Sequence, residues 1–170
     1  MKLASFEAIV QALNAAEVRY LIAGGLAVNA HGYVRFTKDV DIVIALDTDN
    51  ILGAFKALAT LGYKPTVPIT AAQFADAALR QRWIDEKNMK VLNFFSDTYR
   101  ETPVDLFVFE PFEFETEHSL ALQGELLPDL IARFVSIPTL IRMKEAAGRA
   151  RDLDDIEHLR MIQQESARGG

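Results

Sequence analysis

The chain of 170 residues contains no cysteine, only one tryptophan and only three histidines. Without cysteine it can form neither a disulfide framework nor a cysteine-bearing zinc site, which is compatible with a reducing compartment. No apolar run approaches the roughly 18 residues that a membrane span requires, and the first residues, MKLAS, lack the apolar centre of a signal peptide. These absences predict a cytoplasmic protein with no membrane partner.

Positive charge is scarce as well. The chain has 18 lysines and arginines against 24 acidic residues, which gives a net charge of −6. This balance argues against broad nonspecific binding to DNA or RNA, although a local basic patch can still bind a nucleic-acid end. Half of the residues are hydrophobic and a quarter are charged, and the length suits one domain with a real hydrophobic core.

Two aspartates one residue apart, Asp39 and Asp41, open an apolar run with the sequence DVDIVIAL. In an extended strand, residues i and i+2 project from the same face, so both carboxylates are expected on one side while Val40 and Ile42 face away. The apolar run predicts a buried strand, where two like charges are costly unless a cation neutralises them. The pair therefore predicts a site for a hard divalent ion with oxygen ligands, such as magnesium.

A glycine pair, Gly24 and Gly25, lies between a predicted strand at 19–23 and a predicted helix at 26–31. Glycine lets a ligand approach the backbone closely, and the N–H groups at a helix start favour an anion such as phosphate. The pattern lacks the lysine and serine or threonine of a Walker loop and the third glycine of a dinucleotide fingerprint. Taken alone, the pair also fits a plain tight turn. Together with the aspartates it predicts a phosphate site.

A third acid, Asp105, lies within another strand-like run, TPVDLFVF. By alternation it shares a face with Phe107 and Phe109, so a buried Asp105 needs a partner. One candidate partner is a lysine or arginine across the sheet. The other is metal, because three acids around one point can hold two ions about 4 Å apart, which activates a hydroxyl and stabilises the leaving oxygen in phosphoryl-type transfer. We expect Asp39 and Asp41 to contact both ions and Asp105 to bind the ion beside the nucleophile.

Hydrophobic periodicity alternates between helix and strand and predicts an α/β fold of the α+β type, with a mixed sheet flanked by helices. Strands are expected at 19–23, 39–46, 89–95, 103–109 and 131–135, and helices at 5–16, 26–31, 48–61, 70–82 and from 137 onward. Ser5 is expected to cap the first helix, and Ser136 to cap the C-terminal helices with Pro138 in their first turn. The segments 110–117 and 119–128 are expected to be connections. We predict a core over 1–135, a helical segment over 136–166 packed on it, and a frayed tail over 167–170.

The glycine turn, the Asp-x-Asp pair and a distant aspartate on a later strand, in this order, resemble the nucleotidyltransferase superfamily with the DNA polymerase beta-like fold. Gly24, Gly25, Asp39, Asp41 and Asp105 each fall on a motif position. Within that superfamily the chain resembles small bacterial nucleotidyltransferase toxins of the abortive-infection (AbiEii-like) type. The matching stretches are GGLA at 24–27, HG at 31–32, RFTK at 35–38 and residues 140–156, which are similar to that group's late Lys…Arg-x-x-Asp signature. The resemblance spans residues 21–159, and the toxins are generally longer.

The resemblance implies a nucleotidyltransferase fold and a catalytic core that depends on magnesium, with two ions, or on manganese in its place. Such an enzyme transfers a nucleoside monophosphate from a triphosphate such as ATP to a hydroxyl acceptor and releases pyrophosphate. The resemblance favours an RNA or tRNA end as acceptor in a toxin-like role, with a cognate antitoxin as partner. The alternatives are a small-molecule enzyme of the antibiotic-modifying type, protein nucleotidylation, or a catalytically silent relative that binds nucleotide or a partner protein. Acids at all three motif positions argue against the silent alternative.

Further residues are candidates for nucleotide binding. Thr37 and Lys38 leave the loop that presents the predicted metal site, where a triphosphate is expected; a loop-capping threonine and a solvated lysine are the plain alternatives. Lys144 and Arg151 recur with Asp155 at spacings of seven and four, which would place them on one helical face. A surface ion-pair ladder is the plain alternative here, and the resemblance favours a role at the nucleotide.

Overall fold

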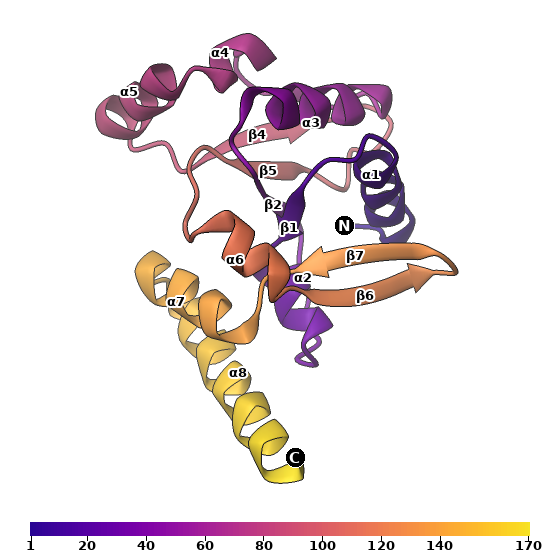
Figure 1. Ribbon diagram of the computed structural model, residues 1–170, viewed down its shortest axis with the longest axis vertical. Coiled ribbons are helices and arrows are strands. Elements are labelled where there is room, and N and C mark those ends of the chain that lie inside the picture. Colours follow the sequence, from indigo (N-terminus) through magenta and orange to yellow (C-terminus); the bar gives the residue numbers. More distant parts are fainter.

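The computed structural model describes all of residues 1–170 and is built on a seven-stranded mixed sheet. The strands are β1 (Tyr20–Ile22), β2 (Val40–Ile44), β3 (Lys64–Pro65), β4 (Val91–Phe95), β5 (Val104–Phe107), β6 (Leu122–Leu127) and β7 (Leu130–Phe134). Their order across the sheet is β3-β4-β5-β2-β1-β7-β6, and Figure 1 shows β4 to β6 of this order following one another from top to bottom. The predicted mixed sheet is confirmed.

The central strands run in both directions. β2 pairs parallel with β5 on one side and antiparallel with β1 on the other, and β1 pairs parallel with β7. The registers join Asp41 to Asp105 and Ile22 to Ile42. Because side chains at matched positions of neighbouring strands lie on one face, this register decides which residues can meet.

Eight helices surround the sheet. They are α1 (Leu3–Ala15), α2 (Gly24–Ala30), α3 (Thr48–Thr60), α4 (Ala71–Ala75), α5 (Ala77–Lys87), α6 (Phe114–Ser119), α7 (Ile137–Ala147) and α8 (Ala150–Gly169). In Figure 1, α3, α4 and α5 lie at the top, whereas α7 and α8 form a helical hairpin at the bottom. None of the helices has the length and apolar character that crossing a membrane would require.

The central strands have one strongly buried face. Four apolar residues of β2 and β5 are at most 1% exposed and belong to a single core cluster: Val40, Ile42, Val104 and Leu106. The residues between them, Asp41 and Asp105, are only partly buried. The apolar residues thus anchor both strands in the core while the acids lie on the opposite face, as the alternation predicts.

The structure differs from expectation over 110–128, where two regular elements replace the expected connections. Helix α6 follows Glu113, whose carboxylate accepts from the backbone N–H groups of Glu115 and Thr116, and β6 pairs antiparallel with β7. Gly124 allows close packing in that pair, because a Cβ there would lie 3.0 Å from the ring of Phe134. A glycine at an inward position hides the alternation that identifies a strand, so periodicity misses β6.

Several helix ends also differ. Ser5 is buried inside α1 and caps nothing. Asp76 divides the helix expected over 70–82, because its side chain caps α5 by accepting from two backbone N–H groups of the first turn. Ser136 precedes α7 with Pro138 in the first turn, as predicted, but makes no side-chain cap bond. α8 continues through Gly169, so most of the expected frayed tail is helical.

Candidate active site

A row of polar residues crosses three neighbouring strands on the less buried face of the sheet. Asn93 of β4 pairs with Asp105 of β5, and Asp105 pairs with Asp41 of β2. On the next strand, the backbone N–H that donates to the Asp41 carbonyl at 2.9 Å is that of Ala23, which places the turn at Gly24 at the end of the row. Backbone pairing therefore brings two of the predicted acids and the glycine turn together.

Asp41 lies against the glycine turn. Gly24 has a φ of +60°, and a Cβ built there would stand 2.0 Å from Oδ2 of Asp41. Glycine is required at this position because φ is positive and because the carboxylate already occupies the space. Burial, together with the negative charges of Asp105 and Asp39, raises the pKa of Asp41 to about 6. The ionised form of Asp41 therefore needs positive charge nearby.

Asp105 has an amide partner rather than a basic one. Asn93 Nδ2 donates to Asp105 Oδ1 at 2.5 Å. Burial raises the pKa of Asp105, the bond from Asn93 opposes that rise, and the charge of Asp39 adds to it. Its neighbours across the sheet are Asn93 and Asp41, so the alternative of a lysine or arginine partner is wrong. The one sequence signal for Asn93 is a polar residue amid the apolar strand VLNFF.

Asp39, Asp41 and Asp105 supply the oxygen donors that a hard divalent cation takes. Asp39 precedes β2 and is partly buried. Its charge raises the pKa of both other acids, so the three lie in one region. Their oxygens do not converge on one point, and no group of three acidic or histidine side chains is gathered closely enough to form a finished metal site. The donor set and its unbalanced negative charge fit a divalent cation, and the metal-ligand roles stay predictions.

Gly25 lies under the loop that joins α2 to β2. A Cβ at Gly25 would stand 2.6 Å from Thr37 Oγ1 and 3.1 Å from Arg35 Nη1, so both side chains pack directly on the turn. Residues alternate along this loop: 33, 35, 37 and 39 are partly buried, whereas 34, 36 and 38 are exposed. The structure thus brings Thr37 to the predicted phosphate site and leaves Lys38 exposed beside it.

A turn separates Lys144 from Arg151. Gly148 has a φ of +63° and ends α7, and α8 begins two residues later, so the two residues do not share one continuous helical face as expected. Lys144 is 4% exposed and its Nζ lies 2.7 Å from Asp155 Oδ2, so the alternative of a surface ladder is wrong. Arg151 is exposed. A nucleotide-binding role for Lys144 or Arg151 stays a prediction.

Two positive charges of the C-terminal hairpin act on Asp41. Arg149 and Lys144 both lower the pKa of Asp41, against the stronger effects of burial and like charge. Arg149 is not apparent from the sequence, because its approach to Asp41 depends on the turn between α7 and α8. The hairpin therefore places positive charge beside the acidic row.

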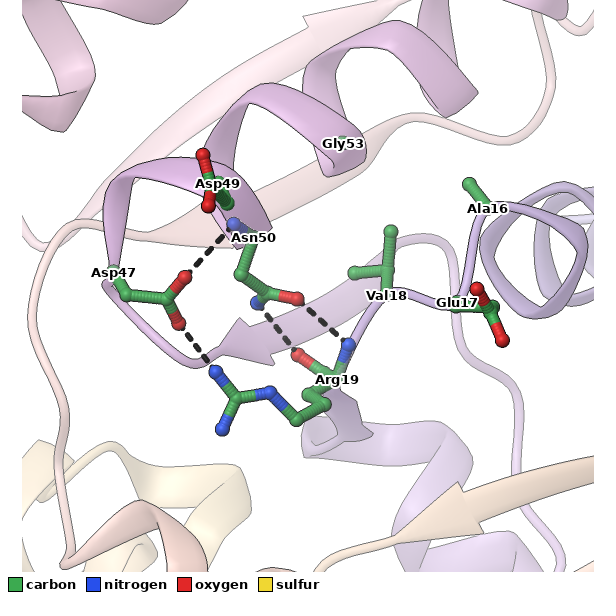
Figure 2. Close-up of a pocket in the computed structure, with 8 residues that line it drawn as sticks. All are labelled: Ala16, Glu17, Val18, Arg19, Asp47, Asp49, Asn50 and Gly53. Atoms are coloured by element: carbon green, nitrogen blue, oxygen red, sulfur yellow. Dashed lines mark hydrogen bonds and ion pairs between the residues drawn. The ribbon is translucent and has the colours of Figure 1, made fainter.

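A separate hollow lies at the opposite ends of β1 and β2. It is lined by Ala16, Glu17, Val18, Arg19, Asp47, Asp49, Asn50 and Gly53, which Figure 2 draws. Asp47 caps α3 by accepting from the backbone N–H of Asn50 and also pairs with Arg19. The Asn50 amide donates to two backbone carbonyls, at 3.0 and 2.8 Å. These polar groups are used in holding the strand ends to α3, and they take no part in the acidic row.

The strand order and the mixed pairing around the acidic row define a nucleotidyltransferase fold. Among solved structures, the crystal structure of ANT(2")-Ia in complex with adenylyl-2"-tobramycin is similar to the chain, with a TM-score of 0.56 over 99% of this chain and 98% of that chain. The two sequences are 11% identical, so the likeness concerns the fold alone. No protein-family model matches the chain, and no curated protein matches it in sequence. The resemblance to abortive-infection toxins therefore stays a prediction.

Proposed function

We propose that the protein is a metal-dependent nucleotidyltransferase, which transfers a nucleoside monophosphate from a nucleoside triphosphate to a hydroxyl acceptor. The observation that carries this proposal is the pairing of Asp41 with Asp105 on adjacent parallel strands, beside the turn at Gly24. A fold similar to that of the aminoglycoside nucleotidyltransferase ANT(2")-Ia supports it.

Asp39, Asp41 and Asp105 would hold two magnesium ions, or manganese in their place. When bound, the ions supply charge stabilisation for the phosphates and lower the pKa of the attacking hydroxyl. The raised pKa of Asp41, caused by burial and by its acidic neighbours, supports this assignment, because a cation would remove the repulsion among the three carboxylates. Thr37, packed on Gly25, would face the phosphates at the turn.

Asp105 would take the proton from the acceptor hydroxyl. Asn93 holds Asp105 Oδ1, which leaves Oδ2 to accept that proton. Burial raises the pKa of Asp105 and makes it a stronger base than an exposed aspartate. The acceptor oxygen then forms a bond to the α-phosphorus, the bond from that phosphorus to the bridging oxygen breaks, and pyrophosphate leaves with the electron pair.

The acceptor that we propose is the hydroxyl group of a small molecule. ANT(2")-Ia, whose complex contains adenylyl-2"-tobramycin, has a similar fold over nearly the whole chain. The net charge of −6 also disfavours a polyanionic acceptor and suits a cationic one. An RNA or tRNA end and a cognate antitoxin, which the resemblance to toxins implies, have no support from the comparisons.

The test is an assay of transfer with α-labelled nucleoside triphosphates, magnesium, and three acceptor pools: aminoglycosides, total RNA and protein extract. Label in an aminoglycoside, with release of pyrophosphate and dependence on Asp105, is the expected result. Label in RNA instead would refute the proposal of a small-molecule acceptor and would still support nucleotidyltransferase activity. Triphosphate binding without transfer to any pool would favour the catalytically silent alternative.

A further inference from the structure

Five charged side chains form a continuous chain between the loop before β2 and the α7–α8 hairpin. Arg35 Nε and Nη2 each lie 2.6 Å from the carboxylate of Asp155. Lys144 Nζ lies 2.7 Å from Asp155 and 3.4 Å from Asp152. Arg149 Nε lies 2.9 Å from Asp152. The chain therefore alternates in sign along its length and contains three cations and two anions.

The middle of this ionic chain is buried. Asp152, Asp155 and Lys144 are 0%, 1% and 4% exposed. Removing charges from water is costly, and apolar side chains of similar volume often stabilise a fold as well as buried ion pairs do. Stability is therefore a weak reason for this arrangement. One positive charge remains unbalanced, and the ionic chain meets the glycine turn of the candidate active site at Arg35, whose Nη1 lies 3.1 Å from the position of a Cβ on Gly25.

The two ends of the ionic chain are arginines whose Nε and Nη2 are each held by a buried carboxylate. Asp152 accepts from Arg149 Nε and Nη2, at 2.9 and 3.3 Å, and Asp155 accepts from the same two nitrogens of Arg35. Arg35 Nη1 donates to a loop carbonyl at 2.9 Å and lies 3.1 Å from the position of a Cβ on Gly25. The Arg149 side chain is 56% exposed, and no hydrogen bond occupies its Nη1. Both guanidinium groups are thus fixed in orientation by a buried carboxylate, Arg35 against the glycine turn and Arg149 with its Nη1 unoccupied.

We propose that Arg149 and Arg35 bind the terminal phosphates of the triphosphate from two sides, and that buried Asp152 and Asp155 are positioning residues for them. This inference rests on the proposed transferase function. A planar guanidinium matches phosphate oxygens with two parallel hydrogen bonds, and prior fixation reduces the entropy that binding costs. The same groups would stabilise the charge that develops on pyrophosphate as it leaves.

Magnesium pyrophosphate is the probe, because it binds without any transfer reaction. Calorimetry would compare the wild-type protein with Arg149→Ala, Arg149→Lys and Arg151→Ala; Arg82→Ala, an exposed arginine paired within α5, is the matched control. Arg149→Ala should weaken pyrophosphate binding about 10- to 100-fold, as for lost hydrogen bonds to a charged group, with a smaller loss for Arg149→Lys. Wild-type affinity in Arg149→Ala, or a larger loss in Arg151→Ala, would overturn the proposal.

A separate binding measurement tests the positioning role of Asp152. Asp152→Asn should weaken pyrophosphate binding while the affinity for a nucleoside monophosphate stays unchanged, because only the terminal phosphates meet Arg149. A merely structural role would lower both affinities together with the melting temperature. Should Asp152→Asn fail to fold, Arg149→Lys decides the question, since it leaves Asp152 in place, keeps the backbone N–H that donates to Asp152 at 3.0 Å, and removes only the guanidinium bonds by which Asp152 orients the side chain.

Different experimental results would refute the proposed function and the proposal for the two arginines. If the wild-type protein binds pyrophosphate through Arg149 but transfers to no acceptor, the transferase proposal is refuted and the phosphate-binding arginines stand. If the wild-type protein transfers and Arg149→Ala keeps the wild-type KM for triphosphate, the arginine proposal is refuted and the transferase stands. A rise in KM for triphosphate together with a fall in kcat supports both.

Discussion

Replacing Asp41 with asparagine should stabilise the metal-free protein at neutral pH. Burial, then the charges of Asp105 and Asp39, raise the pKa of Asp41 from 3.8 to about 6. An acid with a raised pKa binds its proton more tightly in the folded state, so the ionised form destabilises the fold. The penalty is absent below pH 3.8, grows as the pH rises to about 6, and is complete above it. At about 1.36 kcal/mol per pH unit, the full penalty is about 3 kcal/mol.

Asp41→Asn carries no charge and should escape this penalty. Its free energy of unfolding should exceed that of the wild type by up to about 3 kcal/mol at pH 8, which is about 6 to 12 °C in melting temperature for a chain of this size. The difference should vanish near pH 4, where the wild-type carboxyl group is also neutral. Urea unfolding from pH 4 to pH 8 in a chelating buffer measures this dependence.

The control for Asp41→Asn is Asp85→Asn, because Asp85 is exposed on α5. That variant should change the free energy of unfolding by no more than about 0.5 kcal/mol at any pH. Magnesium with triphosphate should raise the melting temperature of the wild type by mass action and leave Asp41→Asn nearly unchanged. A variant less stable than the wild type at pH 8, or equally stabilised at pH 4 and pH 8, would refute the reasoning.

Three further substitutions test the neighbours of Asp41. Gly25→Ala should lower both the melting temperature and the triphosphate affinity, because the added Cβ would stand 2.6 Å from Thr37 Oγ1; unchanged affinity in calorimetry would contradict a phosphate site at the turn. Asp105→Ala should keep much of the magnesium-dependent triphosphate affinity and lose transfer about a hundredfold or more; transfer at the wild-type rate would make Asp105 a structural acid. Asn93→Ala should raise the pKa of Asp105, because the bond from Asn93 favours the ionised form. The acidic limb of the kcat/KM profile should then move to higher pH, and an unmoved limb would show that Asp105 is not the base.

The strands that carry the site are predictable because their signal is local. β2 and β5 are apolar runs in which one alternate position is acidic, and the fold buries the apolar positions and leaves the acids on the other face. β6 carries a glycine where an inward apolar side chain would mark the strand, and it becomes recognisable only through its pairing with β7. Local periodicity therefore finds the elements of the site and misses an edge of the sheet.

The same limit of local periodicity applies to the candidate active site, of which the sequence predicts only a part. Asp39 and Asp41 are two positions apart, so the expectation that they share a face follows from strand geometry. Their proximity to Asp105 depends on which strands pair, and family resemblance rather than periodicity supplies that expectation. The effect of Arg149 on the pKa of Asp41 depends on the turn at Gly148 and on buried contacts of α8, which no short sequence window contains.

The register of β2 with its neighbouring strands determines both the burial of its apolar residues and the position of its acidic side chain. The Ala23 N–H bond to the Asp41 carbonyl fixes β2 against β1, and the match of Asp41 to Asp105 fixes it against β5. A slip of one residue would turn Ile42 toward the site and Asp41 into the core. The buried face opposes that slip, because Val40 and Ile42 would lose their apolar contacts and an unpaired carboxylate would replace them. The hydrophobic core thus holds the acids in one row against their mutual repulsion, and a bound cation would lower the cost of that arrangement.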